Sequence, residues 1–195
     1  MANIMEKEVK YCVKDPLELI NRIKSQNAIF VGYCFEKTTR VDVPNWTLSN
    51  SGTFLRLRSG FKNTLTLKNS RKKDSEVSER KEIEIEIDDI DICHDLLKAL
   101  GLTESLVMEK YRMMWKINDL FITIDELPFG VYTEFEGPIP SIKIISDLLQ
   151  FNFNERIILT YWELYNNFMI SQGNTYYDPN IVFPQNYISR LLMNE

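Results

Sequence analysis

The 195-residue sequence has little that could form a zinc centre or a histidine-based catalytic triad. It contains one histidine, His94, and three scattered cysteines, Cys12, Cys34 and Cys93. Zinc sites need closely spaced His and Cys ligands, so zinc is not expected. His94 falls in an expected helix and is interpreted as a surface or packing residue. Scattered thiols are typical of a reducing compartment, which predicts a cytoplasmic protein.

Long apolar runs and an excess of positive charge are also missing. No stretch approaches the roughly 20 apolar residues of a membrane-spanning helix, and no signal peptide is evident. The chain has 23 Lys and Arg against 28 Asp and Glu, for a formal net charge of −5. We therefore expect neither a nucleic acid nor a membrane as partner. There is no Walker-type glycine loop. Length and composition predict one globular domain over residues 1–195.

The most informative segment lies near the start, where Glu6, Glu8 and Lys10 occupy alternate positions. On a strand, these three side chains point to one face. A lysine binds phosphate oxygens as a point charge, and carboxylates are ligands for hard cations such as Mg²⁺. The ligand class that fits both is a polyphosphate with its divalent metal.

The same alternation recurs along the chain, at residues 54–58, 65–68, 80–87, 108–112, 121–125 and 132–137. Apolar residues on one face with charges of both signs on the other are typical of an antiparallel sheet. A plain sheet with a solvated charged face is the alternative explanation, since charged strands also deter aggregation. The repeated use of Arg, Lys, Glu and Asp, in place of Ser, Thr, Asn and Gln, favours a binding surface.

In this order, the segments resemble the CYTH superfamily of triphosphate tunnel metalloenzymes. That superfamily includes class IV adenylate cyclases, thiamine triphosphatases and inorganic tripolyphosphatases. The matching motifs are E-x-E-x-K at 6–10, L-R-L-R at 55–58, L-T-L-K at 65–68, R-x-E-x-E at 80–84, K-x-R-x-x-W at 110–115 and D…G-x-Y-x-E-x-E at 125–136. Residues 40–52 are similar to the family's Y-F-D-T-P…L…G stretch, although Val41 and Val43 replace the usual aromatic residue and Thr.

The resemblance implies an α+β fold: a closed or nearly closed antiparallel β-barrel with a charged interior and helices packed outside. The barrel core is expected at about 4–137 and the C-terminal helices at about 141–195. The residue pattern predicts separate strands at 28–33 and 36–42, a loop at 45–52 and a basic hairpin tip at 69–78. Helices are expected after the N-cap Asp15, with Leu17, Ile20 and Ile23 on one face, and at 89–100, 141–150 and 155–168.

The resemblance also implies the site. The residues expected to bind phosphates or act in catalysis are Glu6, Glu8, Lys10, Arg56, Arg58, Lys68, Lys110 and Arg112. The expected ligands of one or two Mg²⁺ or Mn²⁺ ions are Glu6, Glu8, Glu134 and Glu136, with help from Asp125, Glu82 or Glu84. Phosphoryl transfer depends on positioning and charge neutralisation, so it needs no covalent nucleophile from the protein.

The attacking group distinguishes two reactions. Water gives a triphosphatase acting on tripolyphosphate, thiamine triphosphate or a nucleoside triphosphate, which is the expected activity. The ribose 3′-hydroxyl of ATP gives cyclic AMP and pyrophosphate, and a class IV adenylate cyclase is therefore the alternative. A second alternative is a non-catalytic polyphosphate-binding module, against which the four metal-binding glutamates argue. A homodimer is left open.

Overall fold

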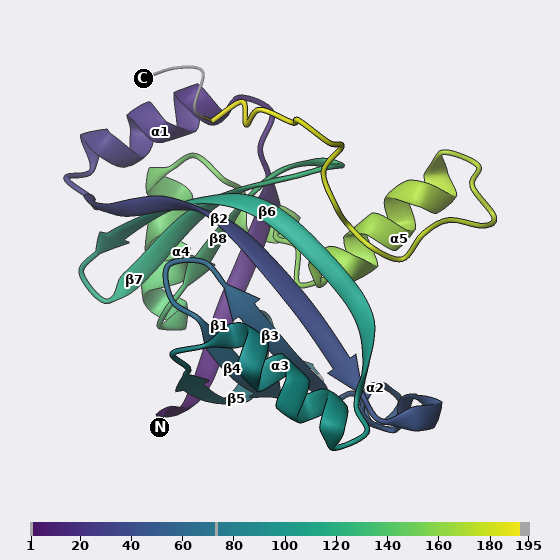
Figure 1. The fold of residues 1–195 in the computed structure, drawn as a ribbon. Coiled ribbons are helices and arrows are strands. Elements are labelled where there is room, and N and C mark those ends of the chain that lie inside the picture. Colours follow the sequence, from purple (N-terminus) through teal and green to yellow (C-terminus); the bar gives the residue numbers. More distant parts are fainter. Residues whose placement is uncertain (1, 73, 192–195) are drawn as a thin grey trace.

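The computed structural model describes residues 2–72 and 74–191. Within these residues, eight antiparallel strands close into a barrel in the order β1-β5-β4-β3-β2-β6-β7-β8 (Figure 1). The strands are β1 (Ala2–Cys12), β2 (Ile29–Asp42), β3 (Phe54–Ser59), β4 (Thr64–Lys68), β5 (Ser78–Glu86), β6 (Thr103–Ile117), β7 (Leu120–Leu127) and β8 (Gly130–Glu136). The predicted α+β barrel is confirmed, and its closure removes unpaired sheet edges.

One long strand replaces the two that were predicted at 28–33 and 36–42. β2 runs unbroken from Ile29 to Asp42 and pairs with β6 along almost its whole length. The pairing register shifts between Phe30 and Gly32, which marks a bulge rather than a break. The 15-residue β6 offers a partner to every part of β2, so pairing outweighs the local irregularity. The two strands form the long curved wall in Figure 1.

The helices pack outside the barrel. They are α1 (Pro16–Ser25), the short α2 (Thr47–Asn50), α3 (Ile90–Ala99), α4 (Ile139–Leu148) and α5 (Tyr161–Ser171), with 3₁₀ turns at Pro44–Trp46 and Phe153–Glu155. Asp15 caps α1 as predicted, accepting from the Glu18 N–H at 3.0 Å. Leu17 was expected on one face with Ile20 and Ile23. The buried residues of α1 are instead Leu19, Ile20 and Ile23, and Leu17 is 42% exposed.

Other helix boundaries also differ from the predictions. The expected loop at 45–52 holds the first 3₁₀ turn and α2. α5 begins at Tyr161, not at residue 155, because Thr160 caps it in a reciprocal capping box with Glu163. The stretch before it is held extended, with a bridge between Ile157 and Lys10. The predicted hairpin tip at 69–78 joins β4 to β5, and Lys73 within it lies outside the described residues.

The apolar cores lie between the barrel and its helices, not inside the barrel. The largest cluster joins the outer faces of β1, β6, β7 and β8 to α1 and α4, and includes Val9, Phe135, Trp115, Ile23 and Ile142. A second lies between α3 and the β2–β4 wall. This arrangement leaves the charged strand faces pointing inward. Among the described residues, no helix is long and apolar enough to cross a bilayer.

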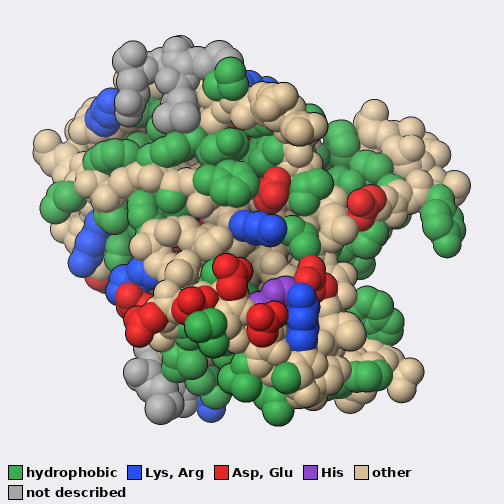
Figure 2. Space-filling model, in the orientation of Figure 1, with side chains coloured by type: hydrophobic (Ala, Val, Ile, Leu, Met, Phe, Trp, Pro, Cys, Tyr) green, Lys and Arg blue, Asp and Glu red, His purple; other side chains and the backbone are tan. Residues whose placement is uncertain are grey.

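The outer surface carries much of the acidic charge. Figure 2 shows Asp and Glu side chains gathered in the lower half of one face, where Figure 1 places α3 and the neighbouring strands. Acidic side chains on this outer face contribute to the net charge of −5.

Candidate functional site

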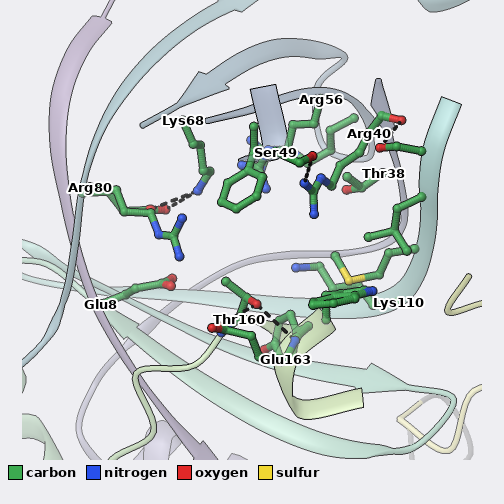
Figure 3. Close-up of a pocket in the computed structure, with 18 of the residues that line it drawn as sticks. Glu8, Thr38, Arg40, Ser49, Arg56, Lys68, Arg80, Lys110, Thr160 and Glu163 are labelled. Atoms are coloured by element: carbon green, nitrogen blue, oxygen red, sulfur yellow. Dashed lines mark hydrogen bonds and ion pairs between the residues drawn. The ribbon is translucent and has the colours of Figure 1, made fainter. Parts of the chain in front are cut away.

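A cavity of about 710 Å³ occupies the interior of the barrel. Eight of its lining side chains are cationic: Lys10, Arg40, Arg56, Arg58, Lys68, Arg80, Lys110 and Arg112. Five are acidic: Glu6, Glu8, Glu134, Glu136 and Glu163. In Figure 3 the labelled Lys and Arg side chains enter one shared space from several strands, with Thr160 and Glu163 on the opposite side. An acidic protein thus concentrates positive charge in one enclosed space, as expected for a polyanion site.

Strand register brings most of the predicted residues together. The six predicted phosphate-binding cations all line the cavity, as do Glu6, Glu8, Glu134 and Glu136. Lys10 lies opposite Glu134 across β1 and β8, and Glu8 lies opposite Glu136. Three predicted metal ligands, Asp125, Glu82 and Glu84, are not among the lining residues.

Lys10 is held by two carboxylates that line the cavity. Its side chain is 3% exposed, its Nζ lies 3.1 Å from Glu134, and it donates a short hydrogen bond to Glu8. Burial disfavours the ammonium, but Glu134 and Glu8 outweigh burial and raise the pKa of Lys10. Burial likewise opposes ionisation of Glu134, yet Lys10, Arg112 and Lys110 hold the pKa of Glu134 well below its usual range. Both groups therefore stay charged at neutral pH.

Asp125 is an internal partner of the cations. It is fully buried and accepts from Arg112 Nε at 2.6 Å and Arg112 Nη2 at 2.5 Å. Lys110 Nζ lies 3.3 Å from it, and the Tyr161 hydroxyl donates to it at 2.7 Å. A bidentate carboxylate fixes the plane of a guanidinium, so Asp125 orients Arg112. With its oxygens occupied in this way, Asp125 is placed to orient cations rather than to face the cavity.

Glu36 performs a similar role and was not predicted. It is 4% exposed, 3.1 Å from Lys110 and 3.9 Å from Arg112. Burial opposes its ionisation, but Lys110 and Arg112 outweigh burial and lower the pKa of Glu36 to about 2. The signal for it was the alternation of Glu36, Thr38 and Arg40 on one face of β2. The predicted strand at 36–42 already contained this alternation, but Glu36 fell in none of the motifs that implied the site.

The other predicted acids off the cavity wall also pair with cations. Lys68 contacts both Glu6, at 2.9 Å, and Glu82. Arg58 donates to Glu84 at 3.1 Å, and the Thr66 hydroxyl donates to the same carboxylate at 2.8 Å. Glu82 thus holds Lys68, and Glu84 holds Arg58, although neither glutamate lines the cavity.

Three cavity arginines have no carboxylate partner within ion-pair distance in the part of the chain that the structure describes: Arg40, Arg56 and Arg80. The guanidinium of Arg40 lies 4.1 Å from the Phe54 ring centroid, and that of Arg80 lies 5.3 Å from it. Among the described residues, Arg56 Nε is buried without a hydrogen-bond partner, as is the Thr38 hydroxyl on the adjacent strand. Burial lowers the pKa of Arg40 to about 10. Buried donors and cations without carboxylate partners on one wall form a surface suited to an anion.

A cluster of acids lies at the β1–β8 side. The Glu136 side chain has no hydrogen bond or ion pair with any described residue. Glu136 lies directly opposite Glu8 across β1 and β8. It reaches solvent through the cavity, but surrounding protein, Glu6 and Glu8 raise the pKa of Glu136 to about 7. Burial also raises the pKa of Glu8, with Glu134 and Glu6 adding to burial and Lys10 opposing it. Opposed like charges are destabilising unless a cation lies between them.

The donor set of this cluster suits a hard divalent cation, since every candidate ligand is a carboxylate oxygen. Among the described residues, no group of three or more His, Cys, Asp or Glu side chains is arranged around one point. Glu8 contacts Lys10 and Glu6 contacts Lys68 instead. A divalent ion at this cluster has to compete with these lysines for the oxygens.

Part of the remaining lining of the cavity is aromatic and apolar, and was not predicted. It includes Trp46, Leu106, Met108, Trp162 and Pro179. Trp46 is 53% exposed and has a left-handed backbone (φ 59°), directly after Asn45 (φ 68°). Two successive residues in this region are unusual outside glycine. They turn the chain so that Trp46 lies at the cavity.

The CYTH domain model matches residues 5–141, which include most of β1 and all of β2 to β8. The chain belongs to the CYTH family. A Methanocaldococcus jannaschii protein, provisionally named as an adenylate cyclase, is 24% identical to this CYTH chain over 172 residues, covering 88% of this chain and 93% of that protein.

Solved structures have the same fold. A Vibrio parahaemolyticus protein, also provisionally named as an adenylate cyclase, matches with a TM-score of 0.72 at 19% identity, over 85% of this chain and 99% of that one. A Hippeastrum protein, described as a provisional adenylyl cyclase with a dominant triphosphatase activity, matches with a TM-score of 0.62 at 16% identity, over 88% and 98%. At such identities, the likeness concerns the fold alone.

Proposed function

We propose that this CYTH protein is a metal-dependent triphosphatase. Its substrate would be tripolyphosphate, thiamine triphosphate or a nucleoside triphosphate, of which it hydrolyses a phosphoanhydride bond. The observation that carries the proposal is a set of three arginines, Arg40, Arg56 and Arg80, in the interior of a net acidic protein. None of the three has a carboxylate partner among the residues that the structure describes. A chain of phosphates is the ligand class that neutralises several such cations at once.

The cations fall into two groups with different tasks. Arg40, Arg56 and Arg80 are available to bind phosphate oxygens directly. Lys10, Lys68, Lys110, Arg58 and Arg112 are already fixed by carboxylates. Fixed cations require little rearrangement when negative charge develops on the transferring phosphoryl group, which is the basis of electrostatic stabilisation.

The acid cluster is the proposed metal site. Glu8 and Glu136, with Glu6 and Glu134, would hold Mg²⁺ or Mn²⁺, since their oxygen donors fit a hard ion and Glu136 has no ion pair with any described residue. A bound ion supplies charge neutralisation and polarisation at the phosphoryl group under attack. The ion-paired Asp125, Glu82 and Glu84 hold cations in place in this scheme.

Adenylate cyclase is the second candidate, and the apolar lining of the cavity favours it. Trp46, Leu106 and Met108 line the same space as the arginines, where they could hold the organic group of a nucleotide. Relatives that carry the adenylate cyclase name point the same way. Cyclisation and hydrolysis need the same phosphate and metal groups and differ in the attacking oxygen.

The test is a substrate panel with two readouts. Tripolyphosphate, thiamine triphosphate and ATP are each supplied with Mg²⁺ or with EDTA, and phosphate and cyclic AMP are both measured. We expect phosphate release that EDTA abolishes and that Arg56→Ala reduces strongly. Lys62→Ala is the matched control, because Lys62 pairs with Glu86 on the exterior.

Each outcome of the panel has a defined interpretation. Cyclic AMP as the main product would show that the protein is an adenylate cyclase and not a hydrolase. Tight tripolyphosphate binding without any turnover supports the non-catalytic binding module instead. Absence of both binding and turnover refutes a triphosphate site in this cavity.

A further inference from the structure

The residue of interest is Tyr161, which lies outside the matched family region. The family model ends at residue 141, and Tyr161 is the first residue of α5. Its side chain nevertheless lines the barrel cavity, and the residue is only 5% exposed. The C-terminal part of the chain thus contributes a side chain to the interior of the barrel.

Tyr161 contacts three charged groups that come from three different strands. Its ring centroid lies 5.4 Å from Lys10 Nζ and 5.3 Å from Lys110 Nζ. Its hydroxyl donates to Asp125 Oδ2 at 2.7 Å. A cation within about 6 Å of an aromatic face is attracted by the ring quadrupole, and more so where water is excluded.

The backbone fixes the position of the Tyr161 ring relative to Lys10. Ile157, four residues before it, exchanges two backbone hydrogen bonds with Lys10, at 2.9 and 2.8 Å. Between them, Thr160 starts α5 with a capping box to Glu163. A movement of α5 along the barrel would therefore disturb both the bridge and the ring contact.

We propose that Tyr161 is a positioning residue for the two cavity lysines. Its ring packs against both Lys10 and Lys110 and holds their ammonium groups in place at the cavity. Its hydroxyl donates to the same Asp125 oxygen that Lys110 contacts at 3.3 Å, and so helps to hold Asp125 against Arg112 and Lys110. The role of the lysines in binding phosphate rests on the proposed function, but the ring contact does not.

Two variants separate the ring from the hydroxyl. Tyr161→Phe keeps the aromatic face and removes only the bond to Asp125. Tyr161→Leu removes both. Tyr165→Leu is the matched control: Tyr165 lies one turn further along α5, packs against Phe129 with tilted rings, and is not among the residues that line the cavity. It loosens the packing of the same helix without touching the lysines.

The first readout needs no ligand. Lysine ε-methylene protons near an aromatic face shift upfield, so the Lys10 and Lys110 signals in lysine-selective ¹H–¹³C spectra should be displaced from those of the other lysines. We expect the displacement in the wild type, Tyr161→Phe and Tyr165→Leu, and its loss in Tyr161→Leu. Unchanged shifts in Tyr161→Leu would overturn the proposal. If that variant fails to fold, Tyr161→Met, with a flexible apolar side chain, replaces it.

The second readout is calorimetric binding of tripolyphosphate without metal. Tyr161→Leu should weaken binding by roughly 10-fold, the order of one desolvated cation–π contact, and Tyr161→Phe by less. Affinity in Tyr161→Leu equal to that of Tyr165→Leu would show that the helix acts only by packing. If the wild type binds no tripolyphosphate, the proposed function fails, while the spectra still decide the position of the lysines.

Discussion

Arg56→Ala should remove most triphosphate turnover while leaving the fold as stable as before. Arg56 has no ion pair with any described residue, and its Nε lacks a hydrogen-bond partner. Its neighbour Arg58 has its pKa lowered by burial and then by the charge of Arg56 itself. Removing Arg56 therefore relieves repulsion in the free protein, and we expect the melting temperature to stay or rise slightly.

The effect on catalysis follows from the loss of a preorganised cation. Removing one such electrostatic donor typically lowers kcat by about 10²–10³, or roughly 2.7–4 kcal/mol of transition-state stabilisation. We expect kcat/KM of Arg56→Ala to fall in this range. Arg56→Lys keeps the charge but loses the planar two-pronged geometry. Its kcat/KM should therefore lie between that of the wild type and that of Arg56→Ala.

Arg112→Ala provides the opposite case. Arg112 is buried against Asp125 and Glu134, so its removal leaves an uncompensated buried charge. Breaking such a pair typically destabilises a protein by about 3–5 kcal/mol. At roughly 2–4 °C per kcal/mol for a chain of this size, the melting temperature should fall by roughly 6–20 °C.

The assay combines phosphate release with thermal unfolding on the same preparations, with Lys62→Ala as the exterior control. Normal kcat/KM in Arg56→Ala would remove Arg56 from the site. A fall in melting temperature as large as that of Arg112→Ala would show that Arg56 is a structural cation, and the division of the arginines into paired and available groups would be wrong.

Three further predictions concern the acids and the histidine. Glu136→Gln should raise the Mg²⁺ concentration needed for half-maximal turnover, and an unchanged Mg²⁺ dependence would exclude Glu136 as a ligand. Because the pKa of Glu136 is raised from 4.5 to about 7, the folded state binds more protons between these values, so unfolding free energy should fall as pH rises through that window. Mg²⁺ should offset this loss of stability near pH 7 and above, so the melting temperature with Mg²⁺ should exceed that without it at these pH values. An equal melting temperature with and without Mg²⁺ at every pH would show that the acids bind no metal. His94→Ala should leave the pH–activity profile unchanged, because His94 contacts Glu104 at 3.3 Å and does not line the cavity; a shifted optimum would contradict this.

The charged face of the barrel was predictable from sequence because side chains alternate along a strand. The spacing of Glu6, Glu8 and Lys10, or of Arg56 and Arg58, fixes which of them share a face, whatever the partner strand. The same local logic predicted the Asp15 cap of α1 and the helix at 89–100, where α3 ends just before Gly101 (φ 87°). These features depend on a few neighbouring residues.

Local patterns failed where a distant partner decided the outcome. β2 is continuous because β6 pairs with it across its irregular stretch. No residue within β2 predicts that β6 is its partner. Glu36 was missed because its role depends on Lys110 and Arg112 of β6, which only the pairing of the two strands brings to it. The placement of Trp46 depends on two left-handed residues, Asn45 and Trp46, whose conformation has no glycine to signal it.

The sequence by itself determined which side chains share one face of each strand, since alternation sorts them, and the order of the motifs identifies the family. Only the tertiary structure decided which charges remain available. Asp125 and Arg56 look alike in sequence, each a charged residue on an alternating strand. Barrel closure places Asp125 against Arg112 and Tyr161 and leaves Arg56 without a carboxylate partner among the described residues. Ion pairing depends on distances between strands and helices far apart in the chain, and those distances exist only once the barrel has closed.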